Sequence, residues 1–159
     1  MSETKILKIK GHDVLVDAEF APLISIFTWQ IVKRDHRLYA EAPVTMAGKR
    51  LTLSMHRLVT KMSALMVDHK NGNGLDNRQS NLRLCTNSQN QHNARKRKNS
   101  KSKFKGVNQL SHNGKWQARI KHKGVEYYLG QFETDVEAAK AYDEGSRKYH
   151  GEFGRRNFD

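Results

Sequence analysis

Residues 67–84 read VDHKNGNGLDNRQSNLRL, and this stretch decides how the middle of the chain should fold. It begins with an apolar residue that leads into an acid and a histidine, Asp68 and His69. A loop rich in glycine and asparagine follows, and residues 81–84 then alternate polar and apolar side chains as a strand does. Residues 86–93 are polar and begin with a threonine that can cap a helix. The stretch therefore predicts a strand, a long loop, a second strand and a helix.

Three polar side chains of this stretch are expected to come together. Asp68 and His69 lie where the first strand runs into the loop, and Asn90 lies one turn into the helix. Because adjacent strand residues point to opposite sides, one of the pair can bind a metal while the other faces a substrate. Carboxylate and amide oxygens are hard donors that suit Mg²⁺ or Mn²⁺, and a neutral histidine can take a proton from water. The residues predict metal-assisted hydrolysis of a phosphodiester.

The same positions resemble the motif of the HNH nucleases, whose site is two strands and a helix around one divalent metal. The resemblance covers about residues 55–93. It implies that His69 is the general base, that Asp68 and Asn90 are metal ligands, and that Asn81 ties the loop to the strand without touching the metal. The alternative, a structural Asp–His pair in a polar loop, is weaker because all four positions have this spacing.

The composition favours a polyanionic partner. The chain has 159 residues, with 29 Lys and Arg against 16 Asp and Glu, which gives a net charge of +13. An anionic membrane surface is the competing explanation, but the sequence has no long apolar stretch and no lipidation signal. Cys85 is the only cysteine and is expected to be a buried filler in the second strand. With no signal-like start, we expect a protein of a reducing cytoplasm, in a bacterial or phage-infected host cell.

The first half of the chain predicts a β-rich scaffold that belongs to the nuclease domain, residues 1–93. Its expected elements are a hairpin over 4–16, a helix over 17–26 capped by Asp17, strands over 29–32, 38–40 and 51–53, and a short helix over 55–59 capped by Ser54. Trp29 is expected in the core. For His56 two roles stay open, a structural one and a supporting one near the phosphate.

Residues 94–103 differ from both neighbours, because 95–103 are almost all basic or small polar side chains. With no apolar side chain to bury, this segment should be a mobile linker. It is either a solvated spacer or an arm that tracks phosphates, and we favour the arm. Its candidate DNA contacts are Arg95, Lys96, Arg97 and Lys98.

Residues 104–159 predict a second domain, a three-stranded antiparallel sheet packed on one helix. Residues 115–121 alternate strictly, with one apolar face and one face of basic and polar side chains. The pair Asn113-Gly114 predicts a hairpin turn, and Thr134 with Glu137 predicts a capping box at the start of the helix. The polar face could enter a major groove, with Gln117 and Arg119 reading base edges. Taken alone, such a face is more often simply wet.

This domain also resembles the AP2 DNA-binding domain, through Gly130-Gln131-Phe132 and the run AAKAY at 138–142. The resemblance implies that the sheet lies in the major groove. Two departures are Asn108 or Glu126 where plant members have arginine, and Gly145 inside the helix, which costs about 1 kcal/mol. The residues that the resemblance places near DNA are Lys105, Asn108, Lys115, Arg119, Lys121, Tyr128 and Tyr142.

Together these patterns predict an α+β chain in which a ββα-metal nuclease domain precedes an AP2-like domain. The expected function is a metal-dependent, homing-type DNA endonuclease that uses Mg²⁺ or Mn²⁺ and acts on double-stranded DNA. The alternative is a non-catalytic DNA-binding regulator. An RNA-binding role is disfavoured because no stacking platform for RNA bases is recognisable. The oligomeric state, and whether one or both strands are cut, stay open.

Overall fold

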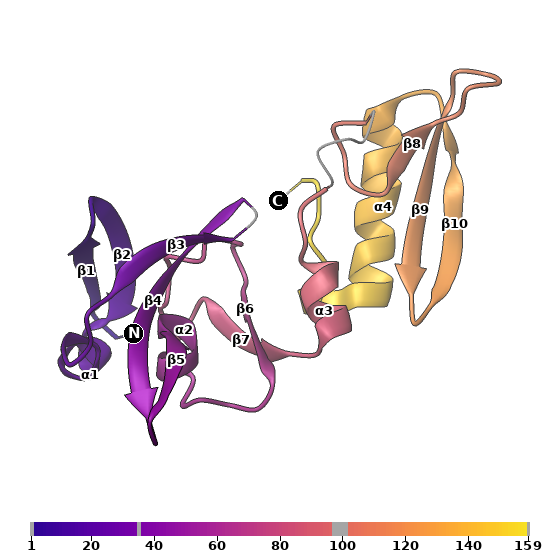
Figure 1. The fold of residues 1–159 in the computed structure, drawn as a ribbon. Coiled ribbons are helices and arrows are strands. Elements are labelled where there is room, and N and C mark those ends of the chain that lie inside the picture. Colours follow the sequence, from indigo (N-terminus) through magenta and orange to yellow (C-terminus); the bar gives the residue numbers. More distant parts are fainter. Residues whose placement is uncertain (1, 35, 97–101, 159) are drawn as a thin grey trace. The chain divides into compact units, whose positions relative to one another are not determined.

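The computed structural model describes residues 2–34, 36–96 and 102–158, and it has the expected α+β composition (Figure 1). The chain divides into two compact units, Met1–Asn87 and Ser88–Asp159. This division falls inside the predicted nuclease domain, a few residues before its predicted end at residue 93. The segments 1–93, 94–103 and 104–159 stay predictions, and each unit is described by itself below.

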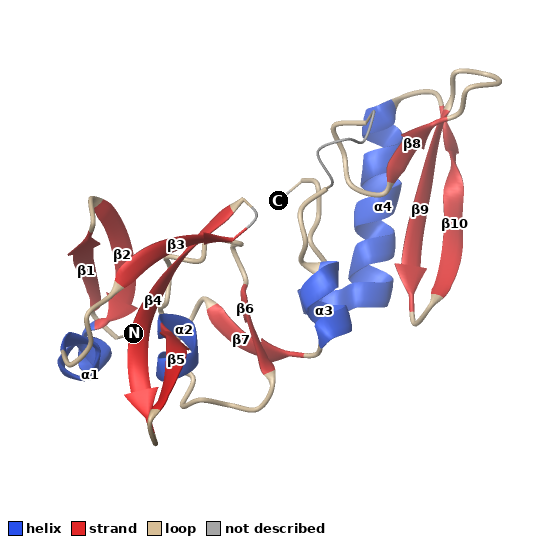
Figure 2. Ribbon diagram, viewed as in Figure 1, coloured by secondary structure: helices blue, strands red, loops and turns tan. Residues whose placement is uncertain are grey.

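The first unit is built from three small antiparallel sheets and short helices (Figure 2). A hairpin joins β1 to β2, a three-stranded sheet has the order β3-β4-β5, and β6 pairs with β7. The element bounds are β1 Thr4–Ile9, β2 His12–Asp17, η1 Ala18–Phe20, α1 Ala21–Ser25, β3 Gln30–Arg34, β4 Arg37–Met46, β5 Lys49–Ser54, α2 Met55–Val59, β6 Met66–His69 and β7 Leu82–Cys85.

One apolar core holds this unit together. Val14 and Val16 of β2, Trp29, and Leu82 of β7 are among its buried members. The Trp29 indole donates a hydrogen bond to the Ile24 carbonyl at 2.8 Å, so its one polar atom is satisfied. The predictions of Trp29 as core and of Cys85 as a buried side chain are therefore confirmed.

The expected helix over 17–26 differs from the structure, because a 3₁₀ turn and a five-residue helix replace it. Asp17 makes no side-chain cap. Its buried carboxylate instead accepts a hydrogen bond at 2.7 Å from the backbone N–H of Gln79, which is 62 residues away in sequence. Asp17 therefore bonds to a residue distant in the sequence instead of capping the helix next to it, and the spacing of residues in the sequence does not reveal that partner. Ser54 precedes α2 without a side-chain cap as well.

The second unit contains a three-stranded antiparallel sheet of order β10-β9-β8 and the long helix α4. The bounds of its elements are α3 Asn87–His92, β8 Val107–Gln109, β9 Trp116–His122, β10 Val125–Phe132, α4 Asp135–His150 and η2 Gly151–Phe153. The loop between β8 and β9 is longer than the two-residue turn expected at Asn113-Gly114. Among the described helices, none has the length and apolarity needed to span a bilayer.

Helix α4 covers the apolar face of this sheet. Thr134 and Glu137 form the predicted capping box, with hydrogen bonds of 3.2 and 3.1 Å. The buried core joins β9 to α4 through Ala118, Ile120 and Tyr142. Gly145 has a packing reason, because a Cβ there would come within 2.7 Å of the Leu129 side chain.

We expect Gly106→Ala to destabilise the second unit by about 3 kcal/mol. Gly106 has φ of +74°, and a Cβ would lie 1.9 Å from the ring of Tyr142, which is buried. Gly114→Ala is the matched control, since its φ of +72° is similar but no atom lies within 4 Å of the new Cβ. The control should cost only about 1 kcal/mol. Hydrogen exchange of the β9 amides in urea measures both, and equal losses would contradict the packing explanation.

Candidate active site and nucleic-acid interface

Asp68 and His69 end strand β6 and are both buried, with 2% and 4% of their surface exposed. In the antiparallel register Asp68 pairs with Arg83 and His69 with Leu82 of β7. Strand alternation gives the two side chains different neighbours, as the sequence predicted. The Asp68 carboxylate forms an ion pair with Arg83, and the His69 ring packs against the ring of His56.

The His69 imidazole lies in a pocket of rings and amides contributed by distant segments. The ring of His56 on α2 is 5.2 Å away, centroid to centroid, in an edge-to-face arrangement, and Tyr39 on β4 is 6.0 Å from both histidines. His69 Nε2 lies 3.4 Å from Oδ1 of Asn77, a fully buried residue of the loop. In the tautomer with the proton on Nε2, this nitrogen donates to Asn77 and Nδ1 is the basic nitrogen of the ring.

Both imidazoles are held in the neutral state. Burial lowers the pKa of His69, although the hydrogen bond to Asn77 and the charges of Asp68 and Asp76 oppose that shift. Burial, then the nearby His69 and Arg57, lower the pKa of His56 to about 4. At neutral pH His69 is therefore in the form that can accept a proton.

The loop between β6 and β7 is fixed by its own polar side chains. Asn81 is buried, and its amide accepts from the Asn71 N–H at 3.1 Å and donates to the Asp76 carbonyl at 2.8 Å. The Asp76 carboxylate accepts two hydrogen bonds from Arg78, at 2.8 and 2.7 Å, and one from Asn71 at 2.9 Å. Burial would raise the pKa of Asp76, but Arg78 and Asn71 bring it below its ordinary value. At neutral pH the Asp76 carboxylate is therefore ionised, which is the form that these hydrogen bonds to the loop stabilise.

The N-terminal hairpin supports this loop from outside. The Leu15 N–H donates to the Leu75 carbonyl at 2.9 Å, and the Asn77 N–H donates to the Leu15 carbonyl at 2.7 Å. Leu15 and Asp76 form an isolated parallel bridge. Asn77, and with it the contact to His69, is therefore positioned by a strand about sixty residues earlier in the chain.

The donors that the sequence assigned to a metal come from both compact units. Asp68 belongs to the first unit, and Asn90 lies half-buried on α3 in the second. A carboxylate and an amide are hard donors, so their chemistry fits Mg²⁺ or Mn²⁺. The Asp68 carboxylate already accepts two hydrogen bonds from Arg83, at 3.0 and 2.7 Å. Across the described ranges, no three His, Cys, Asp or Glu side chains form a cluster able to hold a metal.

The open face of the second unit's sheet carries five of the predicted DNA contacts. Directly opposed residues of neighbouring strands project to the same side. Asn108 opposes Gln117, Arg119 opposes Tyr128, and Lys121 opposes Glu126. Asn108, Arg119, Lys121 and Tyr128 are exposed, and Arg119 is held in place by Glu126 at 2.9 Å and Gln117 at 3.2 Å. This polar face is the candidate nucleic-acid interface.

Two residues that were predicted to contact DNA are largely engaged within the protein, and their contact with DNA stays a prediction. Tyr142 is 3% exposed and packs in the core between sheet and helix, and it also lines a pocket together with Lys105 and Arg119. Lys105 is half-buried, and its ammonium donates to the carbonyls of His92 at 2.5 Å and Ala94 at 2.7 Å. Burial lowers the pKa of Lys105 to about 8, with a smaller effect from Arg155. The Lys105 ammonium is thus engaged by backbone carbonyls.

The remaining predicted contacts are more peripheral. Lys115 forms an ion pair with Glu133 beside the face. Arg95 is exposed, whereas the Lys96 ammonium donates to the carbonyl of Ser102, a buried residue. Within the described residues, the expected mobile linker thus contains an ordered contact at its end. Arg97 and Lys98 lie outside the described residues.

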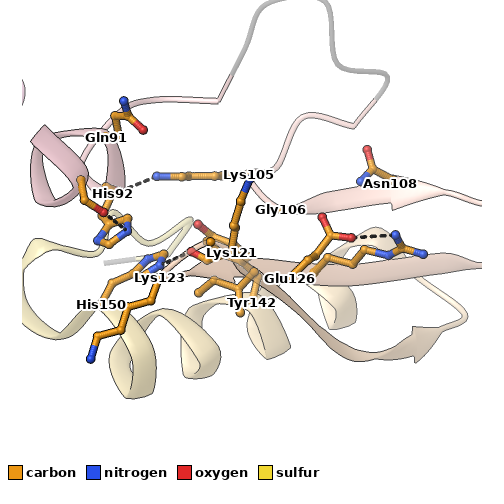
Figure 3. A pocket seen from close by; sticks show the side chains of 14 residues that line it. Gln91, His92, Lys105, Gly106, Asn108, Lys121, Lys123, Glu126, Tyr142 and His150 are labelled. Atoms are coloured by element: carbon orange, nitrogen blue, oxygen red, sulfur yellow. Dashed lines mark hydrogen bonds and ion pairs between the residues drawn. The ribbon is translucent and has the colours of Figure 1, made fainter.

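A pocket of about 460 Å³ lies at one end of the sheet, within the second unit (Figure 3). Ser88, Gln91 and His92 of α3 form one wall. The cations that line it come from the segment before β8, from β9 and from the turn after β9, and they are Lys105, Arg119, Lys121 and Lys123. The basic face therefore continues as far as α3.

Sequence reasoning missed three residues that shape the site, namely Arg83, Asn77 and Tyr39. Arg83 had a signal, because pairing the two predicted strands around the loop places it opposite Asp68. Asn77 and Tyr39 had none, since their contact with His69 depends on how the loop lies on the hairpin and on β4.

Comparison with known proteins agrees with this geometry. The HNH endonuclease family model matches residues 55–92, which contain α2, β6, β7 and α3. An uncharacterized HNH endonuclease of Acanthamoeba polyphaga mimivirus is 30% identical over 155 residues, which is 93% of this chain and 76% of that protein. Two Arabidopsis thaliana proteins, the ethylene-responsive transcription factor WRI1 and an AP2-like ethylene-responsive transcription factor, are each 47% identical over 60 residues. Those matches cover 36% of this chain and 14% and 17% of the plant proteins.

Fold, site and relatives define an α+β protein in which a histidine-centred domain is joined to an AP2-like domain. The chain belongs to the HNH endonuclease family.

We expect Asn81→Ala to destabilise the first unit by about 2 kcal/mol, because it removes two buried hydrogen bonds of the loop. Asn73→Ala is the control. Asn73 is an exposed loop residue whose side chain accepts one hydrogen bond, from the Leu75 N–H at 3.1 Å. Its replacement by alanine should lower the free energy of unfolding by less than about 1 kcal/mol. Urea denaturation followed by hydrogen exchange of the β6 and β7 amides gives both values. A loss for Asn81→Ala no larger than the control's would contradict the role of Asn81 as a loop anchor.

Proposed function

We propose that the protein is a metal-dependent DNA endonuclease of the homing type, whose AP2-like domain selects the region that is cut. The observation that carries the proposal is a buried neutral histidine, His69, next to a carboxylate, Asp68, inside the segment matched by the HNH family. Asn81 anchors the loop that follows, and Asn90 supplies a second oxygen donor. We assign the ββα arrangement of such sites to β6, β7 and α3.

His69 acts as the general base in this mechanism. The Asn77 amide oxygen accepts a hydrogen bond from the Nε2–H of His69, so Nδ1 is left to remove a proton from water as the water oxygen attacks phosphorus. The bond from phosphorus to the 3′ oxygen breaks, and the departing oxygen takes up a proton. His56 and Tyr39 pack against the ring of His69, and burial of this ring lowers its pKa.

Asp68 and Asn90 are the proposed ligands of Mg²⁺ or Mn²⁺. The cation, when bound, would stabilise the negative charge that develops on the phosphate and on the departing oxygen. Arg83 holds the Asp68 carboxylate in one orientation through two hydrogen bonds, so the metal and the guanidinium would both bind the same carboxylate. Asn81 takes no part in the chemistry, and its role is to keep the loop in place.

The three-stranded sheet β10-β9-β8 and helix α4 form the proposed DNA reader. The polar face of this reader sheet supplies affinity and site preference. Gln117 and Arg119 lie at alternate positions of β9 on its polar face and are proposed to read base edges in the major groove. Lys115 and Lys121 are proposed to bind phosphates, as are Arg95 and Lys96 from the arm. Asn108 and Tyr128 extend the same face on the flanking strands.

One observation favours a second candidate, a DNA-binding regulator without catalysis. The Asp68 carboxylate is already paired with Arg83, and a metal has to compete with that partner. The two candidates separate cleanly, because both bind DNA in EDTA and only the endonuclease cuts it when Mg²⁺ is added.

The first test of this function is His69→Ala with supercoiled plasmid. Wild-type protein should cut in Mg²⁺ and stay inactive in EDTA, and His69→Ala should lose about 10²-fold or more in rate because general-base catalysis is gone. His12→Ala is the matched control, since His12 is an exposed histidine of the same unit and should cut normally. Equal rates for wild type and His69→Ala would rule out the catalytic assignment. A wild type that binds but never cuts would establish the regulator instead.

The second test separates base reading from phosphate binding on the sheet. Lys121→Met should weaken binding to all duplexes alike and lower the salt slope, d log K/d log[salt], by about one. Gln117→Ala should leave the salt slope unchanged and relax the preference among sequences, by about 1–3 kcal/mol at one base pair. Selection of binding sites from a random pool, with titrations at several salt concentrations, measures both. The opposite pattern would show that the two positions are wrongly assigned.

A further inference from the structure

Helix α3, which carries the proposed metal ligand Asn90, is not held by a hydrophobic core. Its sequence from Asn87 to His92 is NSQNQH, which contains no apolar side chain, and none of its residues is fully buried. Six residues are also too few for a helix to be stable by itself in water. Something other than apolar burial must therefore keep this helix folded.

The structure places the support at the C-terminal end of α3. The Lys105 ammonium donates to the carbonyl of His92 (Figure 3) and to that of Ala94. The Arg155 N–H also donates to the His92 carbonyl, at 3.1 Å. The last carbonyls of a helix have no partner inside it and carry the negative end of the helix dipole, so a cation there is the favoured partner. Lys105 thus caps α3.

A second contact comes from the side chain of His92. Its ring stacks on the ring of His150, with centroids 3.6 Å apart and planes 8° from parallel. His150 ends α4 and is 9% exposed, and its Nε2 lies 2.9 Å from the Lys121 carbonyl of β9. The stack therefore joins α3 to the rigid part of the reader sheet and helix.

All three supports belong to the AP2-like part of the chain. Lys105 lies two residues before β8, His150 is the last residue of α4, and Arg155 follows this helix. The family resemblance implied that Lys105 touches DNA, but its ammonium is used within the protein instead. This lysine is thus better placed to hold a helix than to hold a phosphate.

We propose that Lys105 and the His92–His150 stack are positioning residues that make α3 a structural part of the DNA reader. Asn90 is then delivered to the metal by the domain that recognises the target. The inference rests on the proposed function, in which Asn90 and Asp68 bind one cation. It adds that the reader contributes to metal binding as well as to DNA affinity.

The test uses the full chain with Lys105→Met, which keeps the length of the side chain and removes its charge. The reporters are the amides of Asn93 and Ala94, which bond to the Gln89 and Gln91 carbonyls of α3 at 3.3 and 3.1 Å. Their hydrogen exchange, followed by NMR without metal or DNA, should become about tenfold faster, because charge-assisted hydrogen bonds are lost. The Mg²⁺ concentration that gives half-maximal cleavage should rise about tenfold. DNA affinity in EDTA should change little.

Lys121→Met is the matched control, because it removes a charge from an exposed lysine of the same sheet. It should lower DNA affinity and leave both the exchange of these two amides and the Mg²⁺ requirement unchanged. His92→Ala should reproduce the effect of Lys105→Met, and His92→Phe should rescue it by restoring a flat ring on His150. These two variants keep the test decisive if Lys105→Met fails to fold.

Three results overturn the inference. One is unchanged exchange of Asn93 and Ala94 in both Lys105→Met and His92→Ala. Another is faster exchange with an unchanged Mg²⁺ requirement, which would show that the docked helix supplies no ligand. The third is a loss of DNA affinity in Lys105→Met as large as in Lys121→Met, with no other change. If wild-type protein does not cleave at any Mg²⁺ concentration, the proposed function has failed, whereas the exchange experiment still decides how α3 is held.

Discussion

The arrangement around His69 depends on a buried polar loop that has almost no hydrophobic means of holding its shape. Asp76 and Asn77 are buried at 1% and 0% exposure, and Asn81 at 7%. Buried polar groups stabilise a structure only when they are hydrogen-bonded, so the conformation of this loop depends on its network of hydrogen bonds. Among the described residues, Nδ2 of Asn77 is a buried nitrogen of the loop that has no partner in this network. The network is supplied by Arg78, Asn71 and the backbone of the N-terminal hairpin. The scaffold half of the chain therefore has a functional role, which is to keep a histidine-bearing loop rigid.

Much of this architecture could be predicted from the sequence where the relevant signals are local. The strict alternation over 115–121 gives a strand with one buried and one polar face, and Thr134 with Glu137 gives the start of α4. The strand–loop–strand–helix order around Asp68 and His69 also follows from short-range patterns. In each case the signal comes from residues close together in the sequence, so the pattern of neighbouring side chains is enough to predict the element.

What could not be predicted depends on distant partners. Asp17 looks like a helix cap but bonds to the backbone of Gln79, and Lys105 looks like a DNA contact but caps α3. The preference of a carboxylate or an ammonium for a partner is visible in sequence, whereas the identity of that partner is not. Tyr142 shows the same limit for an aromatic residue, because a tyrosine suits an interface and a core equally well.

The ion pair of Asp68 with Arg83 has a consequence for how the protein is made. A carboxylate buried to this extent would be costly without a counter-charge, and many metal sites obtain that charge only from the ion they bind. Here the chain carries its own substitute on the opposing strand. The nascent polypeptide can thus bury Asp68 beside a positive charge of its own, and this part of the fold does not have to wait for any divalent ion.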